Sequence, residues 1–235
     1  MRLTHYLTGT GIGLLVAFHP CLSEAAGTGV VEGQVRYVGS KRPGPPIVVP
    51  RSLAVCGHTK RPFDLEIGSD HSLANAVVSI VGVPDSAPPA PIQAEINQKD
   101  CEYIPHVQAL PMGSHLTFVN SDATLHNIHA RRGNLTVSNT AMPLQGQRVP
   151  ASPSLLAHTG KIALKCDAGH TWMGAFIYVF DHPYYAVTDD TGKYKITGLP
   201  PGTYQIRVDH ETLGTSTRSV TVTVGGVVQT DIDLR

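Results

Sequence analysis

The chain lacks an excess of charge of either sign. Its 235 residues include 18 Lys and Arg and 18 Asp and Glu, so the formal net charge is zero at neutral pH. A protein whose main partner is a nucleic acid or an anionic membrane surface carries a clear excess of basic residues. The balance of charge therefore argues against both kinds of partner.

Long apolar runs are also missing. The strongest candidate, residues 11–18, is too short to cross a bilayer as a helix. Arg2 precedes it and the small residues Ser23 and Ala25 follow it, a pattern typical of a secretory signal peptide cleaved after about Ala25. The mature protein is thus predicted to be periplasmic or secreted and to have no membrane span. Lipidation of Cys21 is the alternative that this segment leaves open.

Cysteine is scarce, with four residues in the whole chain. Three remain once the leader is removed, and an odd number in an exported protein leaves one thiol unpaired or bound as a ligand. Cys166 has potential metal ligands as close neighbours. Cys56 and Cys101 are then free to form a disulfide, which an oxidising compartment permits but the sequence alone does not prove.

No stretch shows the 3.6-residue period of a substantial helix. The 23 Gly and 18 Pro point instead to many turns and short strands. Alternating apolar and polar residues predict strands at 29–38 and 92–97, and the apolar run at 76–83 predicts another. From Asp181 onward, strands and Gly-containing turns follow one another with a period of about ten residues, which is typical of a small antiparallel sandwich. The predicted fold class is therefore all-β.

A thiol, an imidazole and a thioether lie within eight residues, at Cys166, His170 and Met173. Two nitrogen ligands and one thiolate in a trigonal set, with a more distant Met, form the ligand set that copper prefers. The second imidazole is available at His126, where a predicted strand ends. Zinc would favour a further Cys, His or carboxylate over Met, so copper is the better match.

Two parts of the sequence resemble known families. Residues 116–129 (LTFVNSDATLHNIH), followed by the thiol, imidazole and thioether, resemble the small blue-copper cupredoxins of the amicyanin and plastocyanin type. Residues 188–194 (TDDTGKY) and 198–204 (GLPPGTY) resemble a carboxypeptidase-regulatory-like, transthyretin-type β module. The combination is similar to bacterial periplasmic plastocyanin-like proteins.

The resemblance implies a division of the chain into three parts. Residues 1–25 would be the signal peptide, and residues 26–180 a cupredoxin Greek-key β-sandwich. Residues 181–235 would form a small transthyretin-like antiparallel β-sandwich.

The resemblance also implies one mononuclear type 1 copper site. Its ligands fall on His126, Cys166, His170 and Met173, and Asn127 would pin the two ligand segments together through hydrogen bonds. The ring edge of His170 would be the solvent-facing port for electrons. This chain departs from plastocyanin in having three residues rather than two between the Cys and the second His, which leaves the Cu–Met distance open.

The function predicted from these features is not enzymatic. A type 1 copper protein would carry single electrons between a redox protein donor and acceptor, for example a c-type cytochrome, and Trp172 is a candidate for the docking patch. The alternative is a copper-containing binding or adhesion module whose C-terminal β domain docks a protein or a polysaccharide. A copper oxidase or reductase usually requires a second copper site, and the sequence contains one cupredoxin signature.

Overall fold

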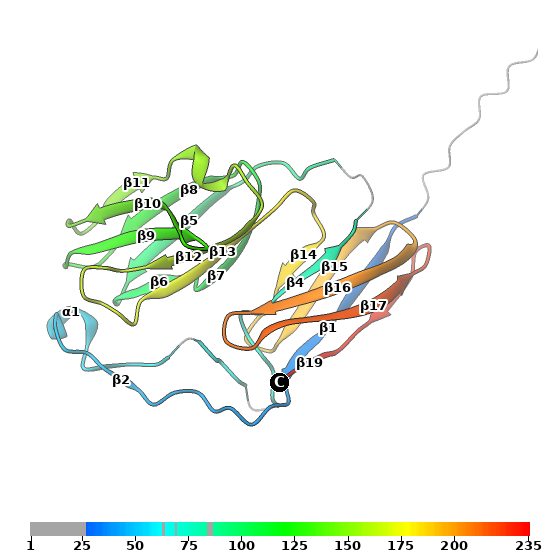
Figure 1. Cartoon of the computed structure of the whole chain (residues 1–235), viewed down its shortest axis with the longest axis horizontal. Helices are drawn as coiled ribbons and strands as arrows, with labels where there is room; N and C mark the ends of the chain where they lie inside the picture. Colours follow the sequence, from blue (N-terminus) through cyan, green and yellow to red (C-terminus); the bar gives the residue numbers. More distant parts are fainter. Residues whose placement is uncertain (1–26, 63, 69, 84–86) are drawn as a thin grey trace, which may run out of the picture.

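The computed structural model describes residues 27–62, 64–68, 70–83 and 87–235. The predicted signal peptide and Cys21 lie outside these residues. Figure 1 shows two β-sandwiches side by side, with an extended segment running beneath them. Strands make up nearly all the regular structure of the described part, so the predicted all-β class is confirmed. Each helix found there is too short to cross a bilayer.

The first sandwich contains the strands between Gln93 and Phe180. One sheet has the order β10-β9-β12-β13-β7, and the other has the order β11-β8-β5-β6. Two neighbouring pairs, β13 with β7 and β5 with β8, are parallel. The two strands of each of these pairs are therefore joined by a crossover connection and not by a hairpin. This is the Greek-key sandwich predicted for the cupredoxin part. Its strands are β5 (Gln93–Lys99), β6 (Glu102–Ile104), β7 (Val107–Pro111), β8 (His115–Asn120), β9 (His126–Arg132), β10 (Leu135–Met142), β11 (Gln147–Pro150), β12 (Gly160–Lys165) and β13 (Gly174–Phe180).

The core of the first sandwich holds the strands that end at the predicted metal site. Every second residue of β9, β12 and β13 points inward, as the period of a strand requires. Burying an aliphatic side chain of this kind contributes about 1.5–3 kcal/mol to stability, so the three strands are firmly positioned. The inward residues, each at most 1% exposed, are Ile128, Ala130, Ile162, Leu164, Ala175 and Ile177.

The second sandwich is built from both ends of the chain. In one sheet β1 lies between β15 and β18, and β19 also pairs with β1. The other sheet has the order β14-β4-β16-β17. Its strands are β1 (Gly29–Tyr37), β4 (Val77–Val81), β14 (Tyr185–Val187), β15 (Lys193–Leu199), β16 (Gly202–His210), β17 (Gly214–Val222), β18 (Val227–Gln229) and β19 (Ile232–Leu234).

This pairing corrects the predicted boundaries of 26–180 and 181–235. Strands β1 and β4 were assigned to the cupredoxin part, but they pair with C-terminal strands and share their core. Val31 and Val35 of β1 are fully buried there. Alternation along 29–38 identifies a strand without identifying its partner, and hence the sequence pattern missed this arrangement. The first sandwich is an insertion between β4 and β14.

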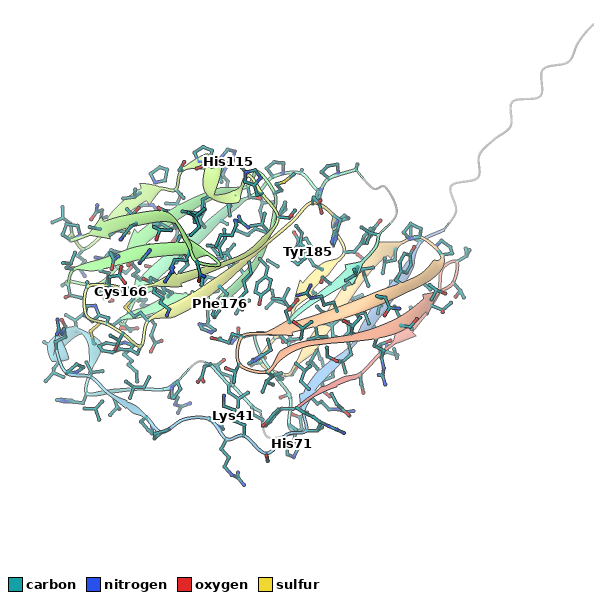
Figure 2. All side chains as sticks on the ribbon, viewed as in Figure 1. Lys41, His71, His115, Cys166, Phe176 and Tyr185 are labelled. Carbon is teal, nitrogen blue, oxygen red and sulfur yellow. A yellow bond between two sulfur atoms is a disulfide. The ribbon has the colours of Figure 1, made fainter. Side chains whose placement is uncertain are left out.

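Between β1 and β4 the chain leaves the second sandwich as an extended arm, defined here as residues 47–60. The strands β2 (Ile47–Val48) and β3 (Thr59–Lys60) pair and enclose the short helix α1 (Leu53–Cys56). A disulfide joins Cys56 to Cys101, 45 residues further along the chain, in the turn between β5 and β6. Figure 1 shows α1 at one end of the first sandwich, and Figure 2 shows Cys166 at the same end.

The two sandwiches meet through an apolar cluster and a charged pair. Val77 of β4 packs with Val107 of β7 and Tyr178 of β13. Beside them, His106 forms an ion-pair contact with Glu211, in the turn between β16 and β17. Strand β13 therefore leads from the predicted metal loop to the contact between the sandwiches.

Candidate metal centre

Three neighbouring strands bring the predicted ligands to one end of a sheet. His126 is the first residue of β9, Cys166 follows the last residue of β12, and Met173 precedes the first residue of β13. Because β12 pairs antiparallel with both β9 and β13, these strand ends adjoin. His170 lies in the loop between β12 and β13. All four residues are buried, with exposed fractions of at most 5%.

Three donor atoms converge on a common point. The distance between Nδ1 of His126 and Nδ1 of His170 is 3.1 Å, and Sγ of Cys166 lies 3.9 Å and 3.6 Å from these two nitrogens. Two nitrogens and one sulfur placed in a plane around a metal ion, with bonds of about 2.0 Å and about 2.3 Å, would be roughly 3.5–3.7 Å apart. The sides of the observed triangle, 3.1, 3.6 and 3.9 Å, lie within about 0.4 Å of these values, and the donor set is one that could hold a metal ion.

Met173 is tied to the tight loop through its backbone. Its backbone N–H donates to the carbonyl of His170 at 2.9 Å. Its side chain is part of the same buried cluster as Cys166. The loop thus keeps a buried thioether residue three positions after the second histidine.

The extra residue of the loop is accommodated by a glycine. Gly169 has a φ of 90°, a value that residues with a side chain rarely adopt. A Cβ at this position would lie 2.5 Å from a guanidinium nitrogen of Arg51, in the arm. The backbone conformation therefore favours glycine here, and a side chain at this position would also displace the flexible end of Arg51.

The amide of Asn127 joins the two ligand segments. Its Oδ1 accepts hydrogen bonds from the backbone N–H of Asp167 at 2.5 Å and of Ala168 at 3.1 Å. Its Nδ2 donates to Oδ1 of Asn139 at 2.8 Å. The residue beside one ligand thus fixes the backbone that follows another ligand.

Asp122 is a further member of the site, and the sequence analysis did not identify it. Its carboxylate accepts a hydrogen bond from Nε2 of His126 at 2.8 Å and from the backbone N–H groups of Asp100 and Cys101, each at 2.8 Å. Burial raises the pKa of Asp122, but these hydrogen bonds outweigh that effect and lower it. In the sequence, the signal for Asp122 was its position four residues before His126.

The pKa shifts of two donors favour the forms that bind a metal. Burial raises the pKa of the Cys166 thiol, but hydrogen bonds with His126 and with the backbone N–H of Asn127 and Ala168 lower it overall, which favours the thiolate. Burial, the charge on His126 and the guanidinium of Arg51 lower the pKa of His170 to about 4, which favours the neutral ring. Burial also lowers the pKa of His126, but its hydrogen bonds with Asp122 and Cys166 raise it overall, so metal binding at this ring competes with a proton.

His129 and Trp172 lie around the candidate centre in different ways. The Nδ1 of His129 contacts Asp167 at 2.7 Å and its Nε2 contacts Thr136 at 2.8 Å, so its ring is engaged outside the triangle. Trp172 is half-buried, its ring lies 5.3 Å from that of His170, and its Nε1 donates to the carbonyl of Cys101 at 2.9 Å. The indole therefore packs beside the centre and ties the loop to the disulfide.

The structure corrects the expectation that the edge of His170 faces solvent. The residue is only 1% exposed, and its Nε2 lies 3.4 Å from Oγ of Ser52 in the arm. The sequence carried no periodic signal that would place residues 47–60 over the loop. The resemblance to small cupredoxins therefore could not predict this cover.

One family model matches the chain. Residues 164–235 match the model described as "Carboxypeptidase regulatory-like domain". The matched segment begins in β12 and contains the C-terminal strands of the second sandwich, but not β1 or β4. No curated protein matches the sequence.

Solved structures similar to parts of the chain include three copper proteins. A purple cupredoxin from Nitrosopumilus maritimus is 23% identical over 37% of this chain and 99% of its own, with a TM-score of 0.32. A Cu-containing nitrite reductase (NirK) from Thermus scotoductus SA-01 is 17% identical over 44% of this chain and 25% of its own, with a TM-score of 0.32. A Cu(I) amicyanin variant is 18% identical over 44% of this chain and 98% of its own, with a TM-score of 0.30. TM-scores this low carry no argument about chemistry. The chemistry of the candidate centre is therefore inferred from its own donor atoms.

Proposed function

We propose that the protein is a periplasmic carrier of single electrons with one type 1 copper site at His126, Cys166, His170 and Met173. The observation that carries the proposal is the buried triangle of two imidazole nitrogens and one thiol sulfur. When bound there, copper would supply the exchange of one electron between its Cu(I) and Cu(II) states. Redox proteins, such as a c-type cytochrome, would be the donor and the acceptor.

The residues of the chain keep the donors in one geometry. The carboxylate of Asp122 orients His126, and the amide of Asn127 fixes the backbone after Cys166. Burial of the donors excludes water from the thiolate. A one-electron carrier benefits from such rigidity, because little rearrangement accompanies the change of oxidation state.

Reconstitution of the mature protein with Cu(II) tests this proposal. We expect an intense thiolate-to-copper absorption band in the visible region and the matching EPR signal. Cys166→Ser should abolish the band, whereas His129→Ala, which changes a histidine outside the triangle, should retain it. A wild-type protein without the band, or a band that survives in Cys166→Ser, would contradict the proposal.

The second candidate function is a binding module with a copper ion that does not cycle. It is favoured by the second sandwich, whose surface carries a hollow of about 690 Å³ lined by polar residues that include Glu32, Lys195 and Gln229. Mixing the Cu(I) protein with an oxidised c-type cytochrome in a stopped-flow instrument separates the two functions. Electron transfer supports the carrier, and a colour-forming site that does not react supports the binding module. We expect no turnover of nitrite or of a phenol in either case.

A further inference from the structure

The arm covers His170 and separates its side chain from solvent. Ser52 lies 3.4 Å from Nε2 of His170 through its hydroxyl, and the same hydroxyl lies 3.3 Å from Oγ1 of Thr124. Arg51 packs over Gly169 in the metal loop. Without these residues the outer edge of the imidazole would face solvent, as it does in the arrangement that the sequence led us to expect.

The non-covalent attachment of the arm is modest. Ser52 makes two long hydroxyl contacts, and Lys60 pairs with Glu102 at 3.2 Å and also donates to the carbonyl of Asp100. Val49 and Val55 add apolar contacts with the core of the first sandwich. Segments held by few buried contacts open locally at a small cost in free energy. The disulfide between Cys56 and Cys101 is therefore the bond that keeps the arm closed.

This disulfide also borders the metal centre. The sulfurs of Cys56 and Cys101 lie within 4.8 Å of a ring nitrogen of His170, and the sulfur of Cys101 lies within 4.8 Å of donor atoms of Asp122 and His126. The indole of Trp172 donates to the carbonyl of Cys101. The disulfide thus connects the arm to the residues that surround His126 and His170.

We propose that the Cys56–Cys101 disulfide is a redox modification site whose reduction opens the arm and exposes the edge of His170. The reductant is a dithiol. Cys56 is 3% exposed, so one thiolate of the reductant attacks Sγ of Cys56 when the arm residues next to the intact disulfide open transiently, and Cys101 leaves as the thiolate. The second thiol of the reductant then resolves the mixed disulfide. Two electrons and two protons pass to Cys56 and Cys101, and the dithiol becomes a disulfide.

The proposed exposure of His170 on opening of the arm does not depend on bound copper. Its consequence for electron exchange rests on the proposed copper function, because an uncovered imidazole edge gives a redox partner a shorter approach to the metal. Thiol chemistry would then control whether the centre exchanges electrons. The two parts are tested separately.

The first test uses the full-length metal-free protein. Hydrogen exchange is followed by mass spectrometry in the oxidised protein and after reduction with dithiothreitol, which serves as the small dithiol. We expect exchange of residues 49–58 to rise about tenfold or more on reduction, while β9 and β13 keep their protection. Unchanged exchange of the arm with both thiols reduced would overturn the proposal. So would a loss of protection throughout the first sandwich, because the disulfide would then be holding the fold rather than the arm.

The second test uses the copper-loaded protein and the double variant Cys56→Ser/Cys101→Ser. The rate of electron exchange with hexacyanoferrate should rise severalfold in the double variant, while Thr59→Ala, an exposed change in the arm, should match wild type. If the double variant does not fold, the first test, which uses wild-type protein reduced with dithiothreitol, alone decides the opening of the arm. A wild-type protein without a copper band would defeat the proposed function and leave the hydrogen-exchange result standing. A normal copper band with equal rates for the closed and the open arm would overturn the control of access.

Discussion

Nε2 of His126 donates a hydrogen bond to the carboxylate of Asp122 at 2.8 Å, while Nδ1 of the same ring faces Cys166 and His170. In the neutral imidazole, the bond on one side fixes the tautomer, which leaves the lone pair on the other side. Asp122 is itself held by two backbone N–H groups. The orientation of one predicted ligand is thus set by a carboxylate that belongs to the turn before β9.

Replacement of Asp122 by Asn should weaken copper binding. The charge that orients His126 and raises its basicity would be lost, and changes at such positions typically cost about 10–100-fold in metal affinity. Competition with a chelator of known affinity measures this directly. The control is Asp167→Asn. Asp167 lies in the same loop, and its exposed carboxylate contacts His129. Equal affinities for Asp122→Asn and wild type would show that the carboxylate does not orient the ligand.

Replacement of Asn127 by Ala should destabilise the first sandwich. The N–H groups of Asp167 and Ala168 would lose their acceptor, and leaving such donors unpaired costs about 1–3 kcal/mol each when they are buried. Neither residue is fully buried, and the N–H of Ala168 also contacts the Cys166 thiol, so we expect the free energy of unfolding in urea to fall by about 1–3 kcal/mol in the metal-free protein. Asn134→Ala changes an exposed asparagine in the β9–β10 turn and should have little effect. A similar small effect for both variants would contradict the role of Asn127.

The ion pair between His106 and Glu211 predicts a pH dependence of the contact between the sandwiches. Burial lowers the pKa of His106, but the hydrogen bond and charge of Glu211, assisted by Glu66, raise it overall. His210 and Lys161 also face this group of charges. Because the folded pKa is raised, the stabilisation is complete below the ordinary histidine pKa of about 6.5 and is lost as the pH rises through the folded value.

Glu211→Gln should remove this dependence. The difference in unfolding free energy between wild type and the variant should be about 1–3 kcal/mol at pH 6 and should shrink toward pH 9. NMR titration of His106 should show a lower pKa in the variant. Glu95→Gln, which removes an exposed partner of Arg148, is the matched control. A difference that grows with pH would mean that the sign is wrong.

The C-terminal segment should not fold alone. Residues 181–235 lack β1 and β4, which are inner strands of the two sheets of the second sandwich. We expect this fragment to give an NMR spectrum without amide dispersion. A chain in which residues 27–38 and 70–83 are linked to 181–235 through Gly/Ser segments should recover it. Dispersed resonances from the fragment alone would show that the sandwich does not need its N-terminal strands.

The sequence predicted local features better than long-range ones. The candidate ligands were identified from the spacing of Cys166, His170 and Met173. The alternation at 29–38 and 92–97 identifies strands that the structure contains as β1 and β5. Both signals arise from side-chain chemistry and from the two-residue period of a strand. Neither signal states which strand lies next to which. The pairing of β1 with β15 depends on contacts far apart in the chain and so required the structure.

The surroundings of the candidate metal centre could not be predicted from the sequence for the same reason. Counting cysteines left Cys56 and Cys101 as a possible pair, but nothing in the sequence placed their disulfide beside His170. The Pro-rich segment before Arg51 indicates only that a central strand is excluded. Asp122 had a short-range signal, because it precedes His126 by four residues, although a polar turn has many such carboxylates.

The insertion of the first sandwich between β4 and β14 changes how the protein would respond to a protease. In two domains joined end to end, one cut near residues 180–181 would release two independent bodies. Here the two pieces would stay paired, because β1 and β4 on one piece hydrogen-bond with β14, β15, β16, β18 and β19 on the other. A single nick at that junction would be invisible to size-exclusion chromatography under native conditions. This arrangement gives the protein tolerance to cleavage at the junction near residues 180–181.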